Sequence, residues 1–163
     1  MSAPMNEQQF LDAMAMAATG VTIVTTNGPE GRAGLTVSAF TSVSASPPLV
    51  LVCINRKNAI VDKITSHQAF SINLLAEAQI GLSEIFAGRA GVERETGFTS
   101  ENWQETEHGQ LLLPSASAGF DCALHAHQDA GTHRIFIGEV RAVHLGESPA
   151  LAYSRRGYRK LSD

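Results

Sequence analysis

The stretch GLTVSAFTSVSASPPLVLVCI, which runs from Gly34 to Ile54, decides the fold of this chain. Its first ten residues are rich in β-branched and aromatic side chains and predict a strand over 34–43. Pro47 and Pro48 interrupt this pattern. The continuously apolar LVLVCI that follows over 49–54 predicts a second strand, buried on both faces.

Strand patterns continue on both sides of this stretch. VTIVTT over 21–26 predicts a strand, and the residues over 27–31 behind it are dense in turn formers. Further strands are predicted over 70–75, 118–128 and 133–145. The last two are separated by Asp129-Ala130-Gly131 and predict a β-hairpin.

Helical patterns are fewer. Asn6 and Gln9 resemble a capping box at the start of a helix that should end near Gly20. A short helix with Asn58 as its N-cap is predicted around 60–64, and another over 76–86. Residues 87–102 are predicted to form a long loop, a candidate for ligand binding. Because strands outnumber helices and short turns join several of them, we expect a mainly antiparallel β fold with peripheral helices, closed into a barrel.

The composition restricts the class of protein. The 163 residues, 44% of them apolar, suffice for one compact domain over 1–163. A net charge of -4 argues against nucleic-acid binding. One basic cluster stands near the C-terminus, and we favour a solvated end over a phosphate-binding site for its members, Arg155, Arg156, Arg159 and Lys160.

The cysteines and the apolar runs indicate a cellular location. Cys53 and Cys122 lie in strand-like runs without metal-type spacing, so we expect reduced core thiols. No apolar run approaches the roughly 20 residues that span a bilayer, and no signal peptide is recognisable. The sequence therefore predicts a cytoplasmic protein without a membrane partner.

Several kinds of catalytic site are absent from the sequence. Gly28, Gly31 and Gly34 do not form a G-x-G-x-x-G motif between a strand and a helix, and no G-x-S-x-G elbow occurs. His125 and His127 would share one face of a strand, but a metal would need a further ligand such as Asp129 or His108. We therefore expect no metal site.

Hydroxyl side chains alternate along Thr36 to Ser44. Alone, this pattern fits a half-exposed strand as well as it fits an edge that hydrogen-bonds a polar heterocycle. The motifs around it favour the second interpretation. They are GLTVSAFTSVSASPPLVLVCINR over 34–56, FSINLL over 70–75, FAG over 86–88, and GTH through IGEV over 131–140.

In this order, together with the opening helix and the closing segment over 153–161, these motifs resemble the short-chain flavin reductases of two-component monooxygenases. The pattern is similar to that of the reductase component of 4-hydroxyphenylacetate 3-monooxygenase and of the flavin reductase of pyrimidine degradation. The resemblance implies a split β-barrel of antiparallel Greek-key type that works as a homodimer. It implies that NADH or NADPH reduces bound FMN or FAD by direct hydride transfer, and that the reduced flavin serves a separate oxygenase.

The resemblance also implies a set of site residues. The backbone and hydroxyls of Thr36, Val37, Ser38 and Ala39 would bind the flavin. The other flavin-binding positions would be Cys53, Ile54, Asn55, Arg56, Asn58, Gly88 and Arg89. Arg56 would face the ribityl chain or phosphate, because a guanidinium offers paired donors to phosphate oxygens. His133, in a catalytic but positional role, and Tyr158 would contact the nicotinamide.

Three questions stay open at this point. Asn58 stands where family members often carry Ser or Thr, so the choice between FMN and FAD is undecided. The basic cluster near the C-terminus does not distinguish NADH from NADPH. A non-catalytic flavin carrier or sensor on the same barrel is the alternative function. An oxidase resembling the pyridoxamine phosphate oxidases is a weaker one, because its basic phosphate-binding residues are not matched here.

Overall fold

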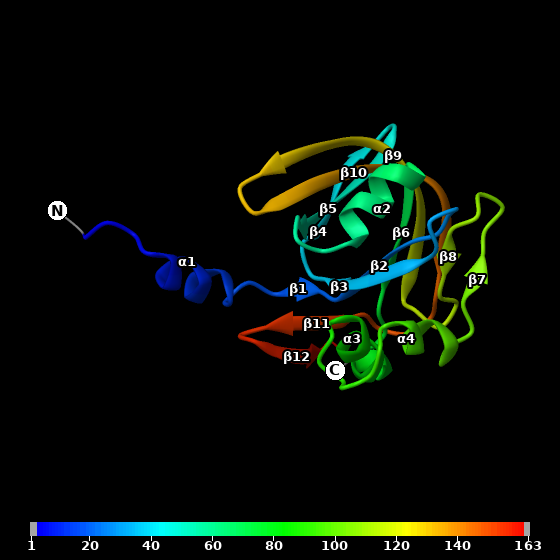
Figure 1. The fold of residues 1–163 in the computed structure, drawn as a ribbon. Helices are drawn as coiled ribbons and strands as arrows, with labels where there is room; N and C mark the ends of the chain where they lie inside the picture. Colours follow the sequence, from blue (N-terminus) through cyan, green and yellow to red (C-terminus); the bar gives the residue numbers. More distant parts are fainter. Residues whose placement is uncertain (1–2, 162–163) are drawn as a thin grey trace.

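The computed structural model describes residues 3–161, and an antiparallel sheet of seven strands forms its centre (Figure 1). The strands of this sheet are β2 (Thr22–Thr26), β3 (Ala33–Val37), β4 (Phe40–Ala45), β5 (Pro48–Asn55), β6 (Ala69–Leu74), β9 (Ala118–Ala130) and β10 (His133–Leu145). Their order is β3-β2-β6-β9-β10-β5-β4. The prediction of a mainly antiparallel β fold is confirmed.

Smaller elements surround the sheet. The remaining strands are β1 (Thr19–Gly20), β7 (Gln104–Glu105), β8 (Leu111–Leu112), β11 (Leu151–Ser154) and β12 (Gly157–Lys160). The helices are α1 (Glu7–Met14), α2 (Ile60–His67), the 3-10 helix η1 (Glu77–Gln79), α3 (Ile80–Phe86) and α4 (Glu95–Thr99). Across residues 3–161, every helix is too short or too polar to cross a bilayer.

The connection between β3 and β4 determines the shape of the sheet. These strands form its two opposite edges, yet only Ser38 and Ala39 join them. In a flat sheet, six strand spacings would separate the edges by about 29 Å. The three Cα steps from Val37 to Phe40 reach only about 11 Å. The sheet therefore curls until its edges approach each other.

The same connection corrects the strand predicted over 34–43. That stretch is two strands, because the chain leaves one edge of the sheet at Ser38 and enters the opposite edge at Phe40. Backbone hydrogen bonds fix the crossing: the Cys53 amide donates to the Ala39 carbonyl at 3.0 Å, and the Phe40 amide donates to the Ser38 carbonyl at 3.0 Å.

Two apolar clusters hold the curled sheet. The first joins β5, β6 and β10 to α2, and the second joins β2 to α3 and α4. In β5 only alternate residues, Val50, Val52 and Ile54, are buried. The prediction that this strand is buried on both faces is therefore wrong: the face of Leu51 and Cys53 is only half-buried.

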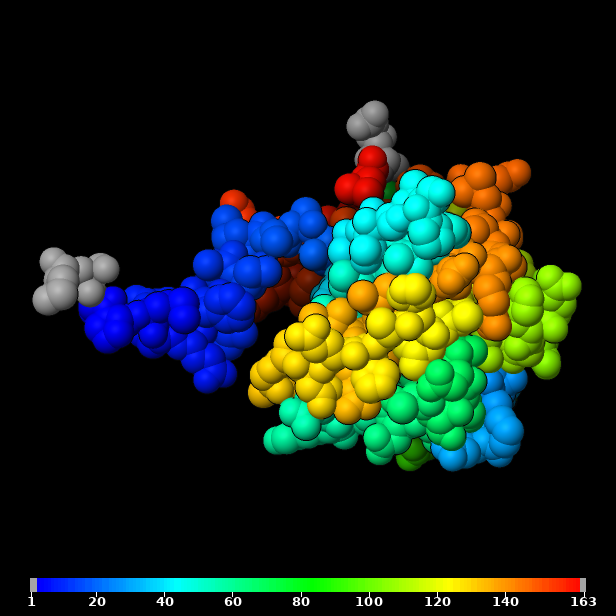
Figure 2. Space-filling view, turned by 90° about the horizontal axis from the view of Figure 1, so that it is seen from above, coloured from blue at the N-terminus to red at the C-terminus, as the bar shows by residue number. Residues whose placement is uncertain are grey.

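The N-terminal helix projects from the body of the molecule (Figures 1 and 2). Its capping box is confirmed, since Asn6 Oδ1 accepts from the Gln9 amide at 2.9 Å and the Asn6 amide donates to Gln9 Oε1 at 3.1 Å. The helix ends at Met14 rather than near Gly20. Pairing of Thr19–Gly20 with β11 replaces the expected helical continuation.

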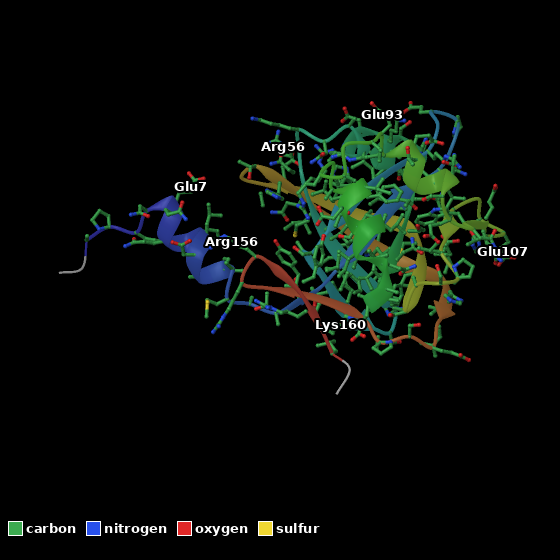
Figure 3. The ribbon with its side chains drawn as sticks, turned by 90° about the horizontal axis from the view of Figure 1, so that it is seen from below. Glu7, Arg56, Glu93, Glu107, Arg156 and Lys160 are labelled. Carbon is green, nitrogen blue, oxygen red and sulfur yellow. The ribbon has the colours of Figure 1, made fainter. Side chains whose placement is uncertain are left out.

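The β11–β12 hairpin is tied to this projecting helix. Arg155 and Arg156 form its turn, both with positive φ, 52° and 59°, which is strained for residues other than glycine. The Arg155 amide donates to the Ala15 carbonyl at 2.6 Å, and Arg156 Nη2 donates to Asp12 Oδ1 at 2.7 Å. Figure 3 shows Arg156 beside the helix that carries Glu7. The basic cluster is exposed, as predicted.

Other local predictions need correction. The N-cap of α2 is Ala59, and the Asn58 side chain instead donates to the Asn55 carbonyl at 3.4 Å, within the preceding turn. The predicted loop over 87–102 contains α4, whose Phe98 is buried against α3. The β9–β10 hairpin is confirmed, but β9 continues through Ala130, so Gly131 and Thr132 form the turn.

Phe86 of α3 packs between two glycines and supports β3. A Cβ added at Gly34 of β3 would lie 2.5 Å from Phe86 Cε1, and one added at Gly97 of α4 would contact Phe86 Cε2. The ring of Phe98 also meets Phe86 edge-on, with 5.0 Å between centroids. The missing side chains at positions 34 and 97 therefore allow an aromatic ring to hold the edge strand in place.

We predict that Gly34→Ala lowers the free energy of unfolding by about 1–3 kcal/mol, because overpacking displaces the Phe86 ring. Gly81→Ala is the matched control, since nothing lies within 4 Å of a Cβ there. That helical substitution should raise stability by up to about 1 kcal/mol. Urea unfolding measures both values. If Gly34→Ala is as stable as the wild type, Phe86 does not constrain β3.

Candidate functional site

A cavity of about 260 Å³, which we call the edge hollow, lies where the two edges of the sheet approach. Its lining residues come from β3, the β3–β4 connection, β5, the α2 entry and β10: Leu35, Thr36, Val37, Ser38, Ala39, Cys53, Ile54, Asn55, Asn58 and His133. The structure thus brings together nine of the predicted site residues, which are separated by up to almost a hundred positions in sequence. None of the lining side chains is a carboxylate, lysine or arginine.

Backbone groups supply much of the polarity of the edge hollow. Because β3 is an edge strand, one side of its backbone has no partner strand and is free to bind a ligand. The Thr36 hydroxyl is already engaged, donating to the Ser83 carbonyl at 2.6 Å. Burial raises the pKa of the Cys53 thiol, which is therefore neutral at pH 7. The Cys53 side chain therefore lines the hollow as a neutral thiol and does not act as a nucleophile.

His133 stands at the rim of the edge hollow. It pairs with Asn55 across the β5–β10 ladder, at the end of β10. Its Nδ1 lies 2.8 Å from the Thr132 hydroxyl, and the residue is exposed. The imidazole is thus oriented by its neighbour and remains accessible from solution.

Arg56 lies just outside the edge hollow, in a neighbouring cavity of about 530 Å³ that shares Asn55 with it. Its Nη1 donates to the Gly131 carbonyl at 3.3 Å, and its Nε lies 3.5 Å from Asp129 Oδ2. The hydrogen bond from Arg134 is the main reason that the pKa of Asp129 is lowered. The Arg56 side chain is half-exposed, so its guanidinium can donate to a ligand from solution.

A second cavity, the tyrosine hollow, measures about 220 Å³ and shares Leu35, Thr36 and Ser38 with the edge hollow. Its other lining residues are Val21, Ser83, Ala87, Arg89, Tyr153 and Tyr158. The rings of Tyr153 and Tyr158 meet edge-on, with centroids 5.4 Å apart. Aromatic and apolar walls beside hydroxyls suit a flat polar ring.

A charged network forms one wall of the tyrosine hollow. Arg89 Nε and Nη2 donate to the two Glu84 carboxylate oxygens at 2.7 and 3.0 Å. Tyr158 donates to Glu84 Oε1 at 2.5 Å and lies 2.9 Å from Ser83 Oγ. The Arg89 hydrogen bond lowers the pKa of Glu84, whereas burial is the main cause that raises the pKa of Tyr158. At neutral pH the carboxylate is ionised and the phenol is not.

A third cavity, of about 200 Å³, adjoins the edge hollow at Leu35 and Asn58. Arg32 forms an ion pair with Glu95 there, and its guanidinium lies 4.7 Å from the centroid of the Phe98 ring.

Gly88 lies apart from these cavities. It follows α3 with a φ of 75°, beside the Arg94 guanidinium.

Apart from Gly88, the predicted residues thus divide between connected cavities. His133 and Tyr158, both predicted to contact one nicotinamide, lie in different hollows that share a wall. The sequence reasoning missed Ser83, Glu84 and Tyr153. Tyr153 was detectable, because a tight turn at 155–156 places it opposite Tyr158 in a hairpin. Glu84 could not be found from the sequence. Its partner Arg89 lies beyond the end of α3, so helical spacing does not predict their contact.

The histidines considered as metal ligands have other neighbours. The His127 ring packs 6.1 Å from that of Phe136, and His125 Nδ1 lies 3.9 Å from Glu139. Over residues 3–161, the structure contains no group of three or more His, Cys, Asp or Glu residues arranged to hold a metal ion.

Comparisons with known proteins agree with the fold. The model of the flavin reductase like domain matches residues 14–162, and the chain belongs to that family. It is 40% identical over 162 residues to the FMN reductase (NADH) RutF of Stutzerimonas stutzeri, covering 99% of this chain and 92% of that protein.

Solved structures show the same fold. The chain is 30% identical to the NADH:FAD oxidoreductase SgcE6 of Streptomyces globisporus, with a TM-score of 0.88 over 100% of this chain and 98% of that one. It is 31% identical to BorF, the flavin reductase component of a bacterial two-component tryptophan halogenase. The TM-score there is also 0.88, over 97% of this chain and 99% of BorF.

Proposed function

We propose that this protein is a flavin reductase that uses NADH to reduce FMN or FAD by direct hydride transfer. The observation that carries the proposal is the pair of joined hollows, which share Leu35, Thr36 and Ser38. Hydride transfer requires two rings held at near-contact distance and needs neither a nucleophile nor a metal. The names of RutF and SgcE6 specify NADH with FMN and with FAD, respectively.

The edge hollow fits the polar edge of a flavin. Free backbone groups of β3 and of the Ser38–Ala39 connection would hydrogen-bond the ring edge, and Cys53 and Ile54 would pack beside it. Asn55 and Asn58 would hold the ribityl chain. Arg56, in the neighbouring cavity, would bind the phosphate with its exposed donors.

The nicotinamide would lie between the rim histidine and the tyrosine hollow. His133, oriented by Thr132, would hydrogen-bond the carboxamide of the nucleotide, which is a positional role. Tyr158 would support the ring from the other side. As the family resemblance implies, Gly88 and Arg89 would close over the phosphate end of the flavin; Arg89 lines the tyrosine hollow, whereas Gly88 lies outside the cavities. The bound flavin supplies the hydride-accepting chemistry, while these residues supply orientation.

The wider assembly is also part of the proposal. BorF is a component of a two-component system, and we propose that this chain likewise supplies reduced flavin to a separate oxygenase. The curled sheet with β3 and β4 as converging edges supports a split barrel of Greek-key type. Cytoplasmic residence would provide NADH and keep the free thiols of Cys53 and Cys122 reduced.

A homodimer is supported by the projecting α1. None of its residues is buried, and the large apolar side chains of Phe10, Leu11 and Met14 lie at helical spacing with about half of each exposed. Figure 2 shows this helix standing away from the body. We propose that this face packs on a second copy of the chain.

The first prediction concerns activity. Purified protein should oxidise NADH rapidly only when FMN or FAD is added, because the flavin is the hydride acceptor. Absorbance at the NADH band measures the rate. NADH oxidation that is independent of flavin would contradict the proposal, and retained flavin without NADH oxidation would favour the non-catalytic carrier.

The second prediction separates the two ligands. His133→Ala should impair the use of NADH more than flavin affinity, and Arg56→Ala should do the reverse. Loss of one such hydrogen bond costs about 1–3 kcal/mol, or roughly 5- to 150-fold. Flavin fluorescence titration and the kcat/KM for NADH are the measurements. Equal effects of each variant on both ligands would contradict this assignment, provided that their thermal unfolding matches the wild type.

The third prediction concerns the dimer. Leu11→Asp combined with Met14→Asp should convert a dimer to a monomer, since two charges would have to be buried in the interface. Light scattering after gel filtration measures the mass. Gln8→Lys, a change on the polar side of α1, is the control and should leave the mass unchanged. A dimer that persists in the double variant would exclude this face as the interface.

A further inference from the structure

Ser83 lies in the middle of α3 and is completely buried. It contacts two strands that belong to different sheets, β3 of the seven-stranded sheet and β12 of the three-stranded sheet. Its carbonyl accepts from the Thr36 hydroxyl at 2.6 Å, and its own hydroxyl oxygen lies 2.9 Å from that of Tyr158. Thr36 lines both hollows, and Tyr158 lines the tyrosine hollow. One buried serine thus connects the shared wall of the two hollows to the aromatic wall of the second.

The direction of the hydrogen bonds around Tyr158 follows from its partners. A phenol has one hydrogen to donate, and the ionised Glu84 carboxylate, which can only accept, takes it. The Ser83 hydroxyl must therefore donate to the Tyr158 oxygen. Arg89 Nη2 donates to the same oxygen at 3.2 Å. The Tyr158 hydroxyl therefore donates once and accepts twice, which fills its hydrogen-bonding capacity.

Tyr158 thus has no hydroxyl contact left for a nucleotide. The part that it presents to the tyrosine hollow is its ring, which meets the Tyr153 ring edge-on with 5.4 Å between centroids. Groups on α3 and just beyond its end hold the oxygen end of Tyr158. The protein therefore fixes the direction of this ring before any ligand binds.

Hydride transfer depends steeply on the spacing between the two reacting rings. A misplacement of about 1 Å can cost roughly a hundredfold in rate. In the proposed function the flavin lies along the free backbone edge of β3, and the nicotinamide lies against Tyr158. These two supports belong to separate sheets, so no strand ladder sets the distance between them. The two Ser83 hydrogen bonds span from one support to the other.

We propose that Ser83 is a positioning residue for hydride transfer, which holds the Tyr158 ring at a fixed spacing from the flavin-binding edge of β3. The proposal rests on the proposed function and deepens it. Ser83 acts through Thr36 and Tyr158, because its carbonyl and its hydroxyl are both engaged by them. It is therefore not a catalytic residue.

The test measures the rate at which NADH reduces bound flavin, by stopped-flow absorbance at saturating NADH. In Ser83→Ala this rate should fall about ten- to a hundredfold, because the Tyr158 ring loses a contact that fixes its position. Flavin affinity should stay at the wild-type value. The KM for NADH should change less than the rate, since the ring that supports the nucleotide is still present.

Tyr158→Phe removes the same hydrogen bond from its other end and keeps the ring, so it should also slow the reduction. Because both changes break one contact, the double variant should be no slower than Tyr158→Phe alone. If Ser83→Ala folds poorly, the fall in rate of Tyr158→Phe at unchanged flavin affinity tests the same contact.

Ser117→Ala is the matched control. Ser117 is also buried, donates to the Ser148 carbonyl at 2.7 Å and lines neither hollow. Its loss should lower the thermal stability without changing the reduction rate. An unchanged rate in Ser83→Ala, additive losses in the double variant, or an equal loss in Ser117→Ala would overturn the proposal. Failure of the proposed function is a separate result, because the wild type would then not reduce flavin with NADH.

Discussion

The two-residue connection between β3 and β4 is the constraint on which the rest of the structure depends. It forces opposite edges of one sheet together, and the converging edges leave the backbone of β3 facing a cavity instead of another strand. Helix α3 packs against β3 through the ring of Phe86, which lies over Gly34. A backbone edge that lines a cavity is thus a result of topology, and it needs no special side chains.

Charged side chains surround the cavities, but none of them lines the edge hollow. No Asp, Glu, Lys or Arg lines the edge hollow, and such a lining suits a large conjugated ring. The surrounding arginines are mostly paired: Arg32 with Glu95, Arg56 and Arg134 with Asp129, and Arg89 with Glu84. Such pairs fix the direction of each guanidinium and keep the local field modest, in a chain with a net charge of -4.

Much of this could be predicted from the sequence, for identifiable reasons. The β-branched runs located β2, β5, β6, β9 and β10, and the family motifs selected residues that the fold does bring together. Periodicity could not reveal that 34–43 changes edges, because no Gly, Pro, Asn or Asp marks the crossing at Ser38 and Ala39. Nor could it place Thr19–Gly20 in a strand, since pairing with the distant Ala152 and Tyr153 decides that conformation. The Glu84–Arg89–Tyr158 network likewise depends on contacts across more than sixty residues.

The turn at Arg155–Arg156 joins the projecting α1 to the hairpin that carries Tyr158. Both residues hold strained backbone conformations, and both contact the segment of α1 or the residue that follows it. The hairpin that they close also carries Tyr158. The position of α1 and the position of the strand that carries Tyr158 are therefore fixed by one and the same turn.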